Sequence, residues 1–422
     1  MKTWTRREFG GLTGAAMLTA LTPRKVLGQS KARVVVIGGG AGGATVARYL
    51  AAGNSGVDVT LVEPKRRYIT CFFSNLYLAG LRSIESLSHG YETLAQRHGI
   101  TVIHEKAAAI DPVAKTVGLE SGAKLPYDRL VLAPGIAFKF GGIDGYNEAA
   151  AQVMPHAWNA GPQSELLRRQ LESMEDGGVF VLVVPPDPFR CPPAPYERAS
   201  LIAYYFKQFK PKSKILILDA KDSFKAQDLF EDAWARHYPG MIEWLPAQFT
   251  GGVMGVDVKA RSVLTAGDTF KAAVANVIPA QTAGELARQA GLADKSGWCP
   301  VDPVTFESTL QPGIHLVGDA IIGGDMPKSA FSANSQAKAC AFAIAAALTG
   351  SEHFAPHLFN SCYTFFAPDD AFSNAINFKP VAGKLKAVDT FLSKLDESPE
   401  IRRRAAHQAV GWYAAFTNDL FG

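Results

Sequence analysis

The sequence predicts an α/β fold with two parallel-sheet domains and a smaller α+β domain at the C-terminal end. Two apolar runs rich in β-branched residues, Arg33–Ile37 and Gly178–Val184, are typical of buried parallel strands. The first run leads directly into the glycine-rich stretch Gly38–Gly43, which marks a tight turn between a strand and a helix. The chain of 422 residues is long enough for two to three domains, each with its own core.

The first of these domains carries the pattern of a dinucleotide site. Three glycines occupy the G-x-G-x-x-G positions: Gly38, Gly40 and Gly43. They allow a close approach of the backbone to a pyrophosphate, and the helix predicted over Ala44–Leu50 directs its N–H groups at the phosphates. A second strand, Val57–Val62, ends at Glu63, where a carboxylate would bind a ribose hydroxyl. This order of elements predicts a Rossmann-like domain.

Two later segments resemble motifs of flavoproteins that bind two dinucleotides. Leu130–Gly135, with Ala133 and Gly135 in its turn, resembles the strand and turn that leave the FAD domain. Gly313–Ala320 resembles the second flavin motif, in which Asp319, after Gly318, would accept a hydrogen bond from a ribityl hydroxyl. The resemblance implies FAD, held by a discontinuous domain over residues 29–150 and 275–345.

The second α/β unit, predicted over residues 151–274, lacks a glycine loop. Its first strand is followed by residues 185–193, which include five prolines and no glycine. Proline donates no backbone N–H, and its ring prevents the close approach of a pyrophosphate. We therefore expect this domain, although Rossmann-like, to bind no NAD, so that electrons must reach a flavin directly from a substrate.

Residues 1–28 are predicted to be an export signal. Arg6 and Arg7 form a twin-arginine pattern ahead of the short apolar stretch Gly10–Leu21, and Val26–Gly28 forms a cleavage site. A disordered basic N-terminus is the alternative.

Residues 1–28 carry the whole net charge of +4, so the remaining chain offers no basic field for nucleic acid or a membrane. No other segment is apolar enough to span a bilayer, which predicts a periplasmic protein without an integral membrane segment.

The chain contains five cysteines, and an odd number in an exported protein leaves at least one outside a disulfide. Cys71 lies in a segment that would run past the flavin, where it either bonds covalently to the cofactor or packs against it as a small side chain. Cys191 lies on the proline-rich loop and Cys362 far beyond it, so they meet only if the C-terminal segment folds back. Whether Cys299 and Cys340 pair is left open.

A disulfide between Cys191 and Cys362 would be either redox-active or static. A redox-active one would be an electrophile for a small sulfur nucleophile. Arg190 and Arg198 either favour a thiolate by their charge or point into solvent. No metal site is predicted.

Four segments resemble the flavoprotein subunit of flavocytochrome c sulfide dehydrogenase, within the disulfide-oxidoreductase superfamily that includes sulfide:quinone reductase: Tyr68–Asn75, Cys191–Arg198, Gly318–Ala320 and Asn360–Tyr363. The resemblance implies an 8α-cysteinyl FAD at Cys71, a redox-active disulfide between Cys191 and Cys362, and Glu197 as a proton acceptor. It implies oxidation of sulfide to sulfur or polysulfide. It also implies a heterodimer with a c-type cytochrome subunit, because this chain has no Cys-x-x-Cys-His haem motif.

Two other functions remain open at this point, a sulfide:quinone oxidoreductase and a non-catalytic flavin-binding redox protein. Glu197 could instead be a surface residue paired with Arg198 or a lysine. In the C-terminal domain, residues 346–422, the amphipathic stretch Leu385–Leu395 could lie on a membrane. The charges in Lys379–Gly422 favour a helical surface for a protein partner. The aromatic residues Trp412, Tyr413 and Phe416 pack over the flavin, line the partner interface or fill a core.

Overall fold

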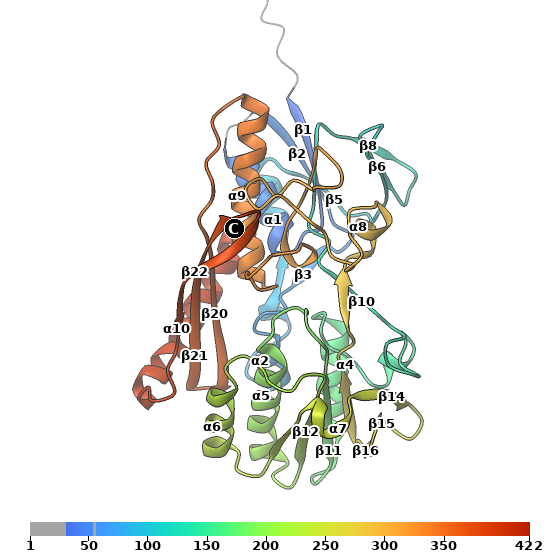
Figure 1. Ribbon diagram of the computed structural model, residues 1–422, viewed down its shortest axis with the longest axis vertical. Coiled ribbons are helices and arrows are strands. Elements are labelled where there is room, and N and C mark those ends of the chain that lie inside the picture. Colours follow the sequence, from blue (N-terminus) through green and yellow to red (C-terminus); the bar gives the residue numbers. More distant parts are fainter. Residues whose placement is uncertain (1–30, 54–55) are drawn as a thin grey trace, which may run out of the picture. The chain divides into compact units, whose positions relative to one another are not determined.

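A five-stranded parallel sheet carries the glycine-rich turn (Figure 1). The computed structural model describes residues 31–53 and 56–422, so the predicted export signal at residues 1–28 lies outside the described residues. The strand order is β19-β9-β1-β2-β5, with bounds Ala32–Ile37 (β1), Val57–Val62 (β2), Thr101–Ile103 (β5), Arg129–Leu132 (β9) and Ile314–Leu316 (β19). Because β19 lies far beyond β9 in the sequence, the unit around this sheet is discontinuous along the chain.

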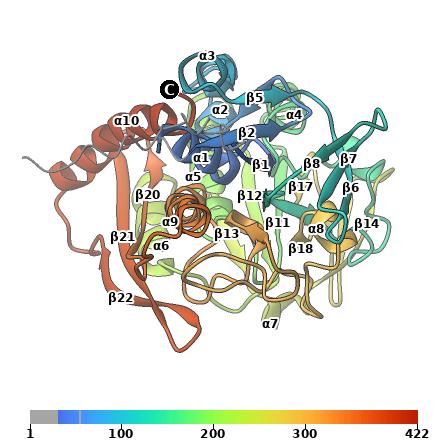
Figure 2. The same ribbon diagram turned by 90° about the horizontal axis from the view of Figure 1, so that it is seen from above.

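Two helices pack together against this sheet, α1 (Ala41–Ala52) and α9 (Ala330–Thr349), and both views show them side by side (Figure 2). The helix α1 begins three residues earlier than predicted, inside the glycine stretch. Glycine is required here because a Cβ on Gly43 would lie 1.8 Å from the Gly38 carbonyl oxygen. Gly38 itself has a φ of +96°, and its Cβ would lie 2.4 Å from the Ala133 carbonyl oxygen.

A second parallel sheet has the order β13-β12-β11-β17, with bounds Val179–Val184 (β11), Lys214–Asp219 (β12), Ile242–Leu245 (β13) and Val274–Val277 (β17). Four helices belong to this unit: α4 (Pro162–Ser173), α5 (Ala194–Phe209), α6 (Gln227–His237) and α7 (Ala247–Thr250). The strand β11 is apolar and almost wholly buried, as predicted. The proline-rich residues 185–193 connect β11 to α5.

Short antiparallel ladders surround the two parallel sheets. They are β3 (Arg67–Ile69) with β4 (Ser88–Gly90); β6 (Ala107–Asp111), β7 (Thr116–Leu119) and β8 (Lys124–Pro126); β10 (Ile136–Phe138) with β18 (Gln281–Ala283); and β14 (Val253–Asp257), β15 (Ser262–Thr265) and β16 (Thr269–Lys271). The remaining short helices are α2 (Ser74–Leu78), α3 (Glu92–His98) and α8 (Glu285–Gln289). Through the pair β10–β18 the chain leaves the first sheet and later returns to it.

The C-terminal region consists of the antiparallel sheet β20 (Leu358–Ala367), β21 (Asp370–Val381) and β22 (Lys384–Leu392), followed by α10 (Pro399–Phe421). The predicted α+β character is confirmed, but the helical prediction is correct only for α10 and wrong for residues 379–392. Ala382 and Gly383 both have positive φ and form a two-residue hairpin turn that joins β21 to β22. The strand β20 contacts both α5 and α9, so the C-terminal segment does fold back onto the two α/β units.

Candidate active site

A cavity of about 600 Å³ lies at the carboxyl ends of the strands of the first sheet, where α/β folds bind their ligands. Most of the residues predicted to hold a cofactor line it: Gly38, Gly40, Glu63, Cys71, Ala133, Gly135, Gly318 and Asp319. Gly43 does not line the cavity and instead permits the contact between α1 and the end of β1. The glycine-rich turn and the acids therefore meet around one space.

The polar groups of this cavity fit a dinucleotide cofactor. The Glu63 carboxylate accepts hydrogen bonds from the Gly39 N–H at 2.8 Å and the Lys65 N–H at 3.0 Å, which fixes its orientation at the end of β2. Asp319 Oδ1 is buried and, among the described residues, has no hydrogen-bond partner. A buried carboxylate oxygen of this kind calls for a donor, and a cofactor hydroxyl would supply one. Burial raises the pKa of Asp319, and a bonded donor would counteract that shift.

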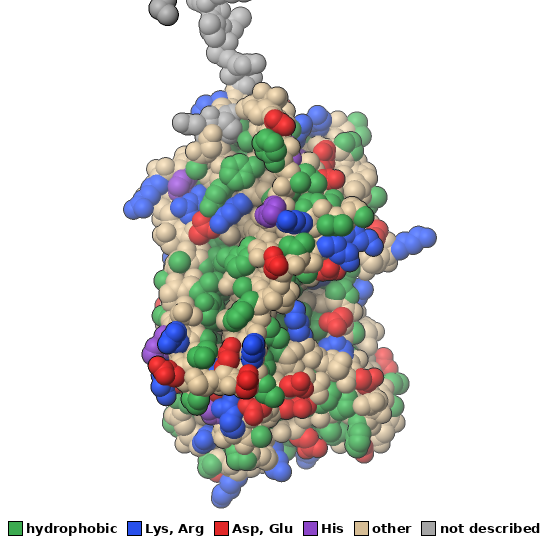
Figure 3. Space-filling model, turned by 60° about the vertical axis from the view of Figure 1, so that its left-hand side comes forward, with side chains coloured by type: hydrophobic (Ala, Val, Ile, Leu, Met, Phe, Trp, Pro, Cys, Tyr) green, Lys and Arg blue, Asp and Glu red, His purple; other side chains and the backbone are tan. Residues whose placement is uncertain are grey.

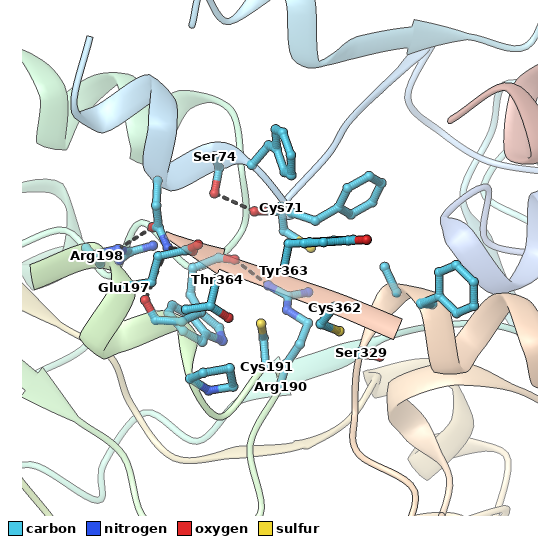
Figure 4. A pocket seen from close by; sticks show the side chains of 18 of the residues that line it. Cys71, Ser74, Arg190, Cys191, Glu197, Arg198, Ser329, Cys362, Tyr363 and Thr364 are labelled. Carbon is cyan, nitrogen blue, oxygen red and sulfur yellow. Dashed lines mark hydrogen bonds between the residues drawn. The ribbon is translucent and has the colours of Figure 1, made fainter. Parts of the chain in front are cut away.

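A second cavity, of about 70 Å³, brings together three cysteines that are far apart in the sequence (Figure 4). Cys71 precedes α2, Cys191 lies on the proline-rich loop before α5, and Cys362 lies on β20. Cys71 lines the larger cavity as well, together with Arg190 and Ala330. The two cavities are therefore neighbours, and Cys71 lies where they meet.

The structure records all five cysteines as free thiols. Cys299 and Cys340 are buried in the core of the first sheet and line neither cavity. Cys191 has a φ of +56°, its N–H donates to the Lys328 carbonyl at 2.7 Å, and its own carbonyl accepts from the Ala194 N–H at 2.9 Å. These backbone contacts hold the loop so that the Cys191 thiol lines the smaller cavity.

Burial raises the pKa of two thiols that line the smaller cavity, Cys191 and Cys362. The neighbouring Cys362 and Glu197 raise the pKa of Cys191 further. The charge of Arg190 lowers this pKa, but the net shift is still upward. The pKa of Cys362 is raised to about 11, although a hydrogen bond to Asn360 opposes the shift. The charge of Arg190 therefore favours the Cys191 thiolate, as predicted, but desolvation outweighs it and the pKa of this thiol is raised overall.

The two arginines do not point into solvent. Arg198 is buried, with 2% of its surface exposed, and donates to Asn75 Oδ1, Asn276 Oδ1 and the carbonyls of His156 and Ala157. Arg190 Nη1 lies 4.0 Å from Asp319 Oδ2, and its Nη2 donates to Asn159 Oδ1. Arg190 thus places a positive charge where the two cavities meet.

Glu197 lies in the first turn of α5, and its carboxylate lines the cysteine cavity. Oε1 accepts from the Phe365 N–H at 2.9 Å, and Oε2 accepts from Asn75 Nδ2 at 2.7 Å. Burial raises the pKa of Glu197 to about 7, while these two hydrogen bonds and the charge of Arg198 oppose the shift. The alternative of a surface residue paired with a cation is excluded. A carboxyl with a pKa near neutrality can accept and return a proton at physiological pH.

Three residues of the site escaped the sequence-based interpretation. The sequence gives Asn75 no role beyond its place in the segment Tyr68–Asn75, yet its amide contacts Glu197 and Arg198. Lys328 donates from Nζ to the carbonyls of Asp319 and Ile321, and burial lowers its pKa to about 8. Trp158 lines the cysteine cavity beneath Arg198. Nothing local in the sequence marks these residues, because their partners come from other elements.

The helix α10 closes the cysteine cavity on one side. Trp412 lines the cavity and stacks on Phe331 with ring centroids 6.0 Å apart. Phe416 packs against the same Phe331 ring at 5.1 Å. The Tyr413 hydroxyl lies 3.1 Å from both Thr70 Oγ1 and His89 Nε2, which ties α10 to the segment that carries Cys71. Of the three predicted aromatic residues, Trp412 is thus the one that lines the site.

Three segments of the chain match known protein families. Residues 164–279 match the central domain of the sulfide dehydrogenase (flavocytochrome c) flavoprotein chain. Residues 354–421 match the flavin-binding domain of flavocytochrome c sulphide dehydrogenase. Residues 32–168 match the pyridine nucleotide-disulphide oxidoreductases. These matches reach both parallel-sheet units and the C-terminal region.

The sulfide dehydrogenase (flavocytochrome c) flavoprotein chain of Chlorobaculum thiosulfatiphilum is 58% identical over 43 residues, which are 10% of this chain and 90% of that relative. The mitochondrial sulfide:quinone oxidoreductase of Mus musculus is 24% identical over 298 residues, or 68% of this chain. The chain spans 65% of the length of that mouse relative, and 28% of the length of the sulfide-quinone reductase of Aquifex aeolicus. The X-ray structure of the sulfide:quinone oxidoreductase from Aquifex aeolicus has a TM-score of 0.72 at 21% identity, covering 92% of this chain and 91% of that one. This likeness confirms the predicted fold class.

Proposed function

We propose that this chain, which belongs to the family of flavocytochrome c sulfide dehydrogenase flavoprotein chains, oxidises hydrogen sulfide by means of two cysteines and a bound FAD. The observation that carries the proposal is the small cavity in which Cys191, Cys362 and Glu197 meet beside the cofactor cavity. A cavity of about 70 Å³ has room for hydrosulfide or a short sulfur chain and little more.

The residues of the larger cavity fit FAD. The turn Gly38–Gly43 and the start of α1 would hold the pyrophosphate, Glu63 a ribose hydroxyl, and Asp319 a hydroxyl of the ribityl chain. Bound there, FAD would accept the two electrons that the cysteine pair releases. The Lys328 contacts with the carbonyls of Asp319 and Ile321 keep this turn in place.

We infer that no nicotinamide supplies electrons, because the second unit offers no place for its phosphates. The loop of residues 185–193 has five prolines and no glycine. Asp219, at the end of β12, corresponds in position to a ribose-binding acid, but it already accepts hydrogen bonds from Trp244 and Lys221 and from the Tyr196 hydroxyl. Phe224 stacks on Tyr196 with ring centroids 3.6 Å apart and fills the space beside it.

The proposed sulfur chemistry begins with a disulfide between Cys191 and Cys362, which line the same cavity. The sulfur of H₂S attacks one cysteine sulfur, so that a persulfide bond forms while the bond between the two cysteines breaks. Because burial raises the pKa of both cysteines, the departing sulfur leaves as a thiol. Glu197 accepts the proton from H₂S and returns it to that thiol.

The second half of the cycle restores the disulfide. The persulfide and the thiol re-form the bond between Cys191 and Cys362 and release one sulfur atom at the oxidation level of elemental sulfur. Two protons and two electrons are released in the same step. The protons leave through Glu197, whose pKa of about 7 suits exchange with water. The proposed acceptor of the two electrons is FAD bound in the neighbouring cavity, which shares Cys71 and Arg190 with the cysteine cavity.

We propose further that Cys71 holds FAD covalently through a thioether to its 8α-methyl group. Support comes from the position of Cys71, which lines both cavities and whose carbonyl is fixed by the Ser74 hydroxyl at 2.6 Å. After acid precipitation, the flavin of the wild-type protein should stay with the pellet. Cys71→Ala should release all of it into the supernatant, measured by flavin absorbance, whereas Cys299→Ala should retain it. A colourless wild-type pellet would refute the bond.

The proposed electron acceptor is a c-type cytochrome subunit, in a periplasmic heterodimer formed after export by the twin-arginine route. The exposed face of the β21–β22 hairpin suits a protein partner, because Val388 and Phe391 are 43% and 55% exposed on β22 near Lys384 and Lys386. Figure 3, which brings this side forward, shows apolar and basic side chains interspersed on it. Among the described residues, no helix combines the length and the apolar character that crossing a membrane requires.

Quinone is the competing acceptor, because the Mus musculus and Aquifex aeolicus relatives are named for it. The test is purification from the periplasmic fraction, a search for co-eluting haem, and anaerobic addition of sulfide. We expect flavin bleaching followed by haem reduction. Bleaching without haem, with turnover only when quinone is added, would replace the cytochrome by quinone. The absence of any bleaching would overturn sulfide oxidation itself.

A further inference from the structure

We propose that Asn75 is a positioning residue for Glu197, whose side-chain amide holds the carboxylate at the cysteine cavity in the orientation that proton transfer requires. The inference rests on the proposed function, in which Glu197 carries a proton between sulfur atoms. Asn75 lies in α2, four residues after Cys71, and only 4% of its surface is exposed. It lines the cysteine cavity together with Glu197 and Arg198.

Both ends of the Asn75 amide are hydrogen-bonded. Nδ2 donates to Glu197 Oε2 at 2.7 Å and to the Ala194 carbonyl at 3.1 Å, while Oδ1 accepts from Arg198 Nε at 3.1 Å. Among the described residues, no direct hydrogen bond joins Glu197 to Arg198. The amide therefore lies between a buried cation and a buried carboxylate, and its orientation is fixed because only its nitrogen can donate to Glu197.

The carboxylate of Glu197 joins the three segments that carry the cavity sulfurs. Oε2 is bonded to the α2 segment that follows Cys71, and Oε1 is bonded to the backbone of β20, three residues after Cys362. Glu197 itself lies in α5, six residues after Cys191. Without Asn75 the carboxylate would keep the Phe365 contact only and could rotate about its terminal torsion, which is broad and weakly restrained in a glutamate.

The charges that face Glu197 come from its own helix, the loop before it and β20. Arg198 on α5 favours the carboxylate form, while Cys191 on the loop and Cys362 on β20 would oppose it if either ionised. The α2 segment contributes the neutral amide of Asn75. Removal of this donor takes away one of the two hydrogen bonds that favour the charged form, so the pKa of Glu197 should rise.

The experiment compares the pH profile of anaerobic flavin reduction by sulfide in wild type and Asn75→Leu. Loss of a hydrogen bond to a charged group should move the rise in rate toward higher pH by about one unit. The rate of Asn75→Leu should then be about fivefold below that of the wild type at pH 7 and should approach the wild-type rate near pH 9. The rate constant at saturating sulfide should change, while the sulfide concentration at half-saturation should not. The ionisation of sulfide is the same in both proteins and cancels in the comparison.

Asn276→Leu is the matched control. Asn276 is a fully buried asparagine that accepts from Arg198 Nη1 at 2.7 Å and does not contact Glu197. If Asn75 acts only by supporting Arg198, then Asn276→Leu should shift the profile equally, and that result would overturn the proposal. Asn75→Asp keeps the acceptor for Arg198 but removes the donor, and should shift the profile in the same direction as Asn75→Leu.

A readout without turnover separates this inference from the proposed function. The infrared carbonyl band of protonated Glu197, identified by its loss in Glu197→Gln, should titrate at higher pH in Asn75→Leu than in wild type. If wild type is not reduced by sulfide at any pH, the proposed function is wrong, and the infrared titration still decides the role of Asn75. Suppose instead that sulfide reduces the wild type. If Asn75→Leu and Asn75→Asp then show the wild-type pH profile and the wild-type infrared titration, only the inference about Asn75 is wrong.

Discussion

Replacing either Cys191 or Cys362 by serine should slow the reduction of bound FAD by sulfide at least about 1,000-fold, measured by anaerobic stopped-flow absorbance. A serine hydroxyl cannot form the disulfide that the proposed mechanism requires, and each variant leaves its partner cysteine without a second sulfur. FAD content should stay at the wild-type level, because neither cysteine lines the larger cavity. Reduction by dithionite should also be unchanged, since that reagent bypasses the cysteines.

Cys340→Ala is the control for this pair. Cys340 is a fully buried cysteine on α9 that lines neither cavity, so its removal tests for general damage to the core. We expect it to keep the wild-type rate of reduction by sulfide at some loss of stability. If Cys191→Ser or Cys362→Ser keeps a rate within about tenfold of wild type, the pair is a structural feature and the proposed attack on a disulfide is wrong.

Much of the cofactor cavity could be predicted because its residues follow one another along the chain. The strand, the glycine turn and Glu63 lie within residues 32–63, and the physical reason for each is local: φ, close approach and the end of a strand. The sequence predicts a later start for α1 than the structure shows, because Gly42 and Gly43 are poor helix formers. Glycine is nevertheless required at position 43, since the Cβ of any larger residue would clash with the Gly38 carbonyl.

The cysteine cavity could not be derived from local pattern. Cys191 and Cys362 meet because β20 packs between α5 and α9, a tertiary contact that leaves no periodic signal near either residue. The family resemblance, and not spacing, pointed to this pair. Asn75 was missed for a related reason, since its partners Glu197 and Arg198 are more than a hundred residues away.

The strand β22 shows a different limit. Of its nine residues, only Leu385 is buried, so the alternation that marks a half-buried strand is absent. Lysines at both sides of Leu385 are typical of edge strands, where charge discourages pairing with another chain. The same residues in a helix would be amphipathic, which explains the wrong prediction. The two-residue turn at Ala382 and Gly383 gives no clear signal either, because Ala-Gly is not among the dipeptides that typically mark such a hairpin.

Glu197→Gln should lower the rate of flavin reduction by sulfide by about 100- to 10,000-fold at pH 8, the range typical of removing a general acid-base group. The sign of the pH dependence follows from the raised pKa of about 7: below it the wild-type carboxyl is protonated and cannot accept the proton of H₂S, and above it the carboxylate is available. The wild-type rate should therefore rise with pH through about 7. Glutamine cannot titrate, so the variant should lack this rise once both profiles are corrected for the ionisation of sulfide itself.

The variant keeps a side chain of the same size, but its amide can accept only one of the hydrogen bonds that Phe365 N–H and Asn75 Nδ2 now donate. Some loosening of the cavity is expected, and dithionite reduction together with FAD content controls for it. If Glu197→Gln retains the wild-type rise in rate through pH 7 after that correction, another group must carry the proton. Arg198 is unsuited to that role because, even with its pKa lowered to about 9 by burial, it stays charged at pH 7. Burial raises the pKa of both the Cys191 and the Cys362 thiol, so the proposed proton transfer is assigned to Glu197.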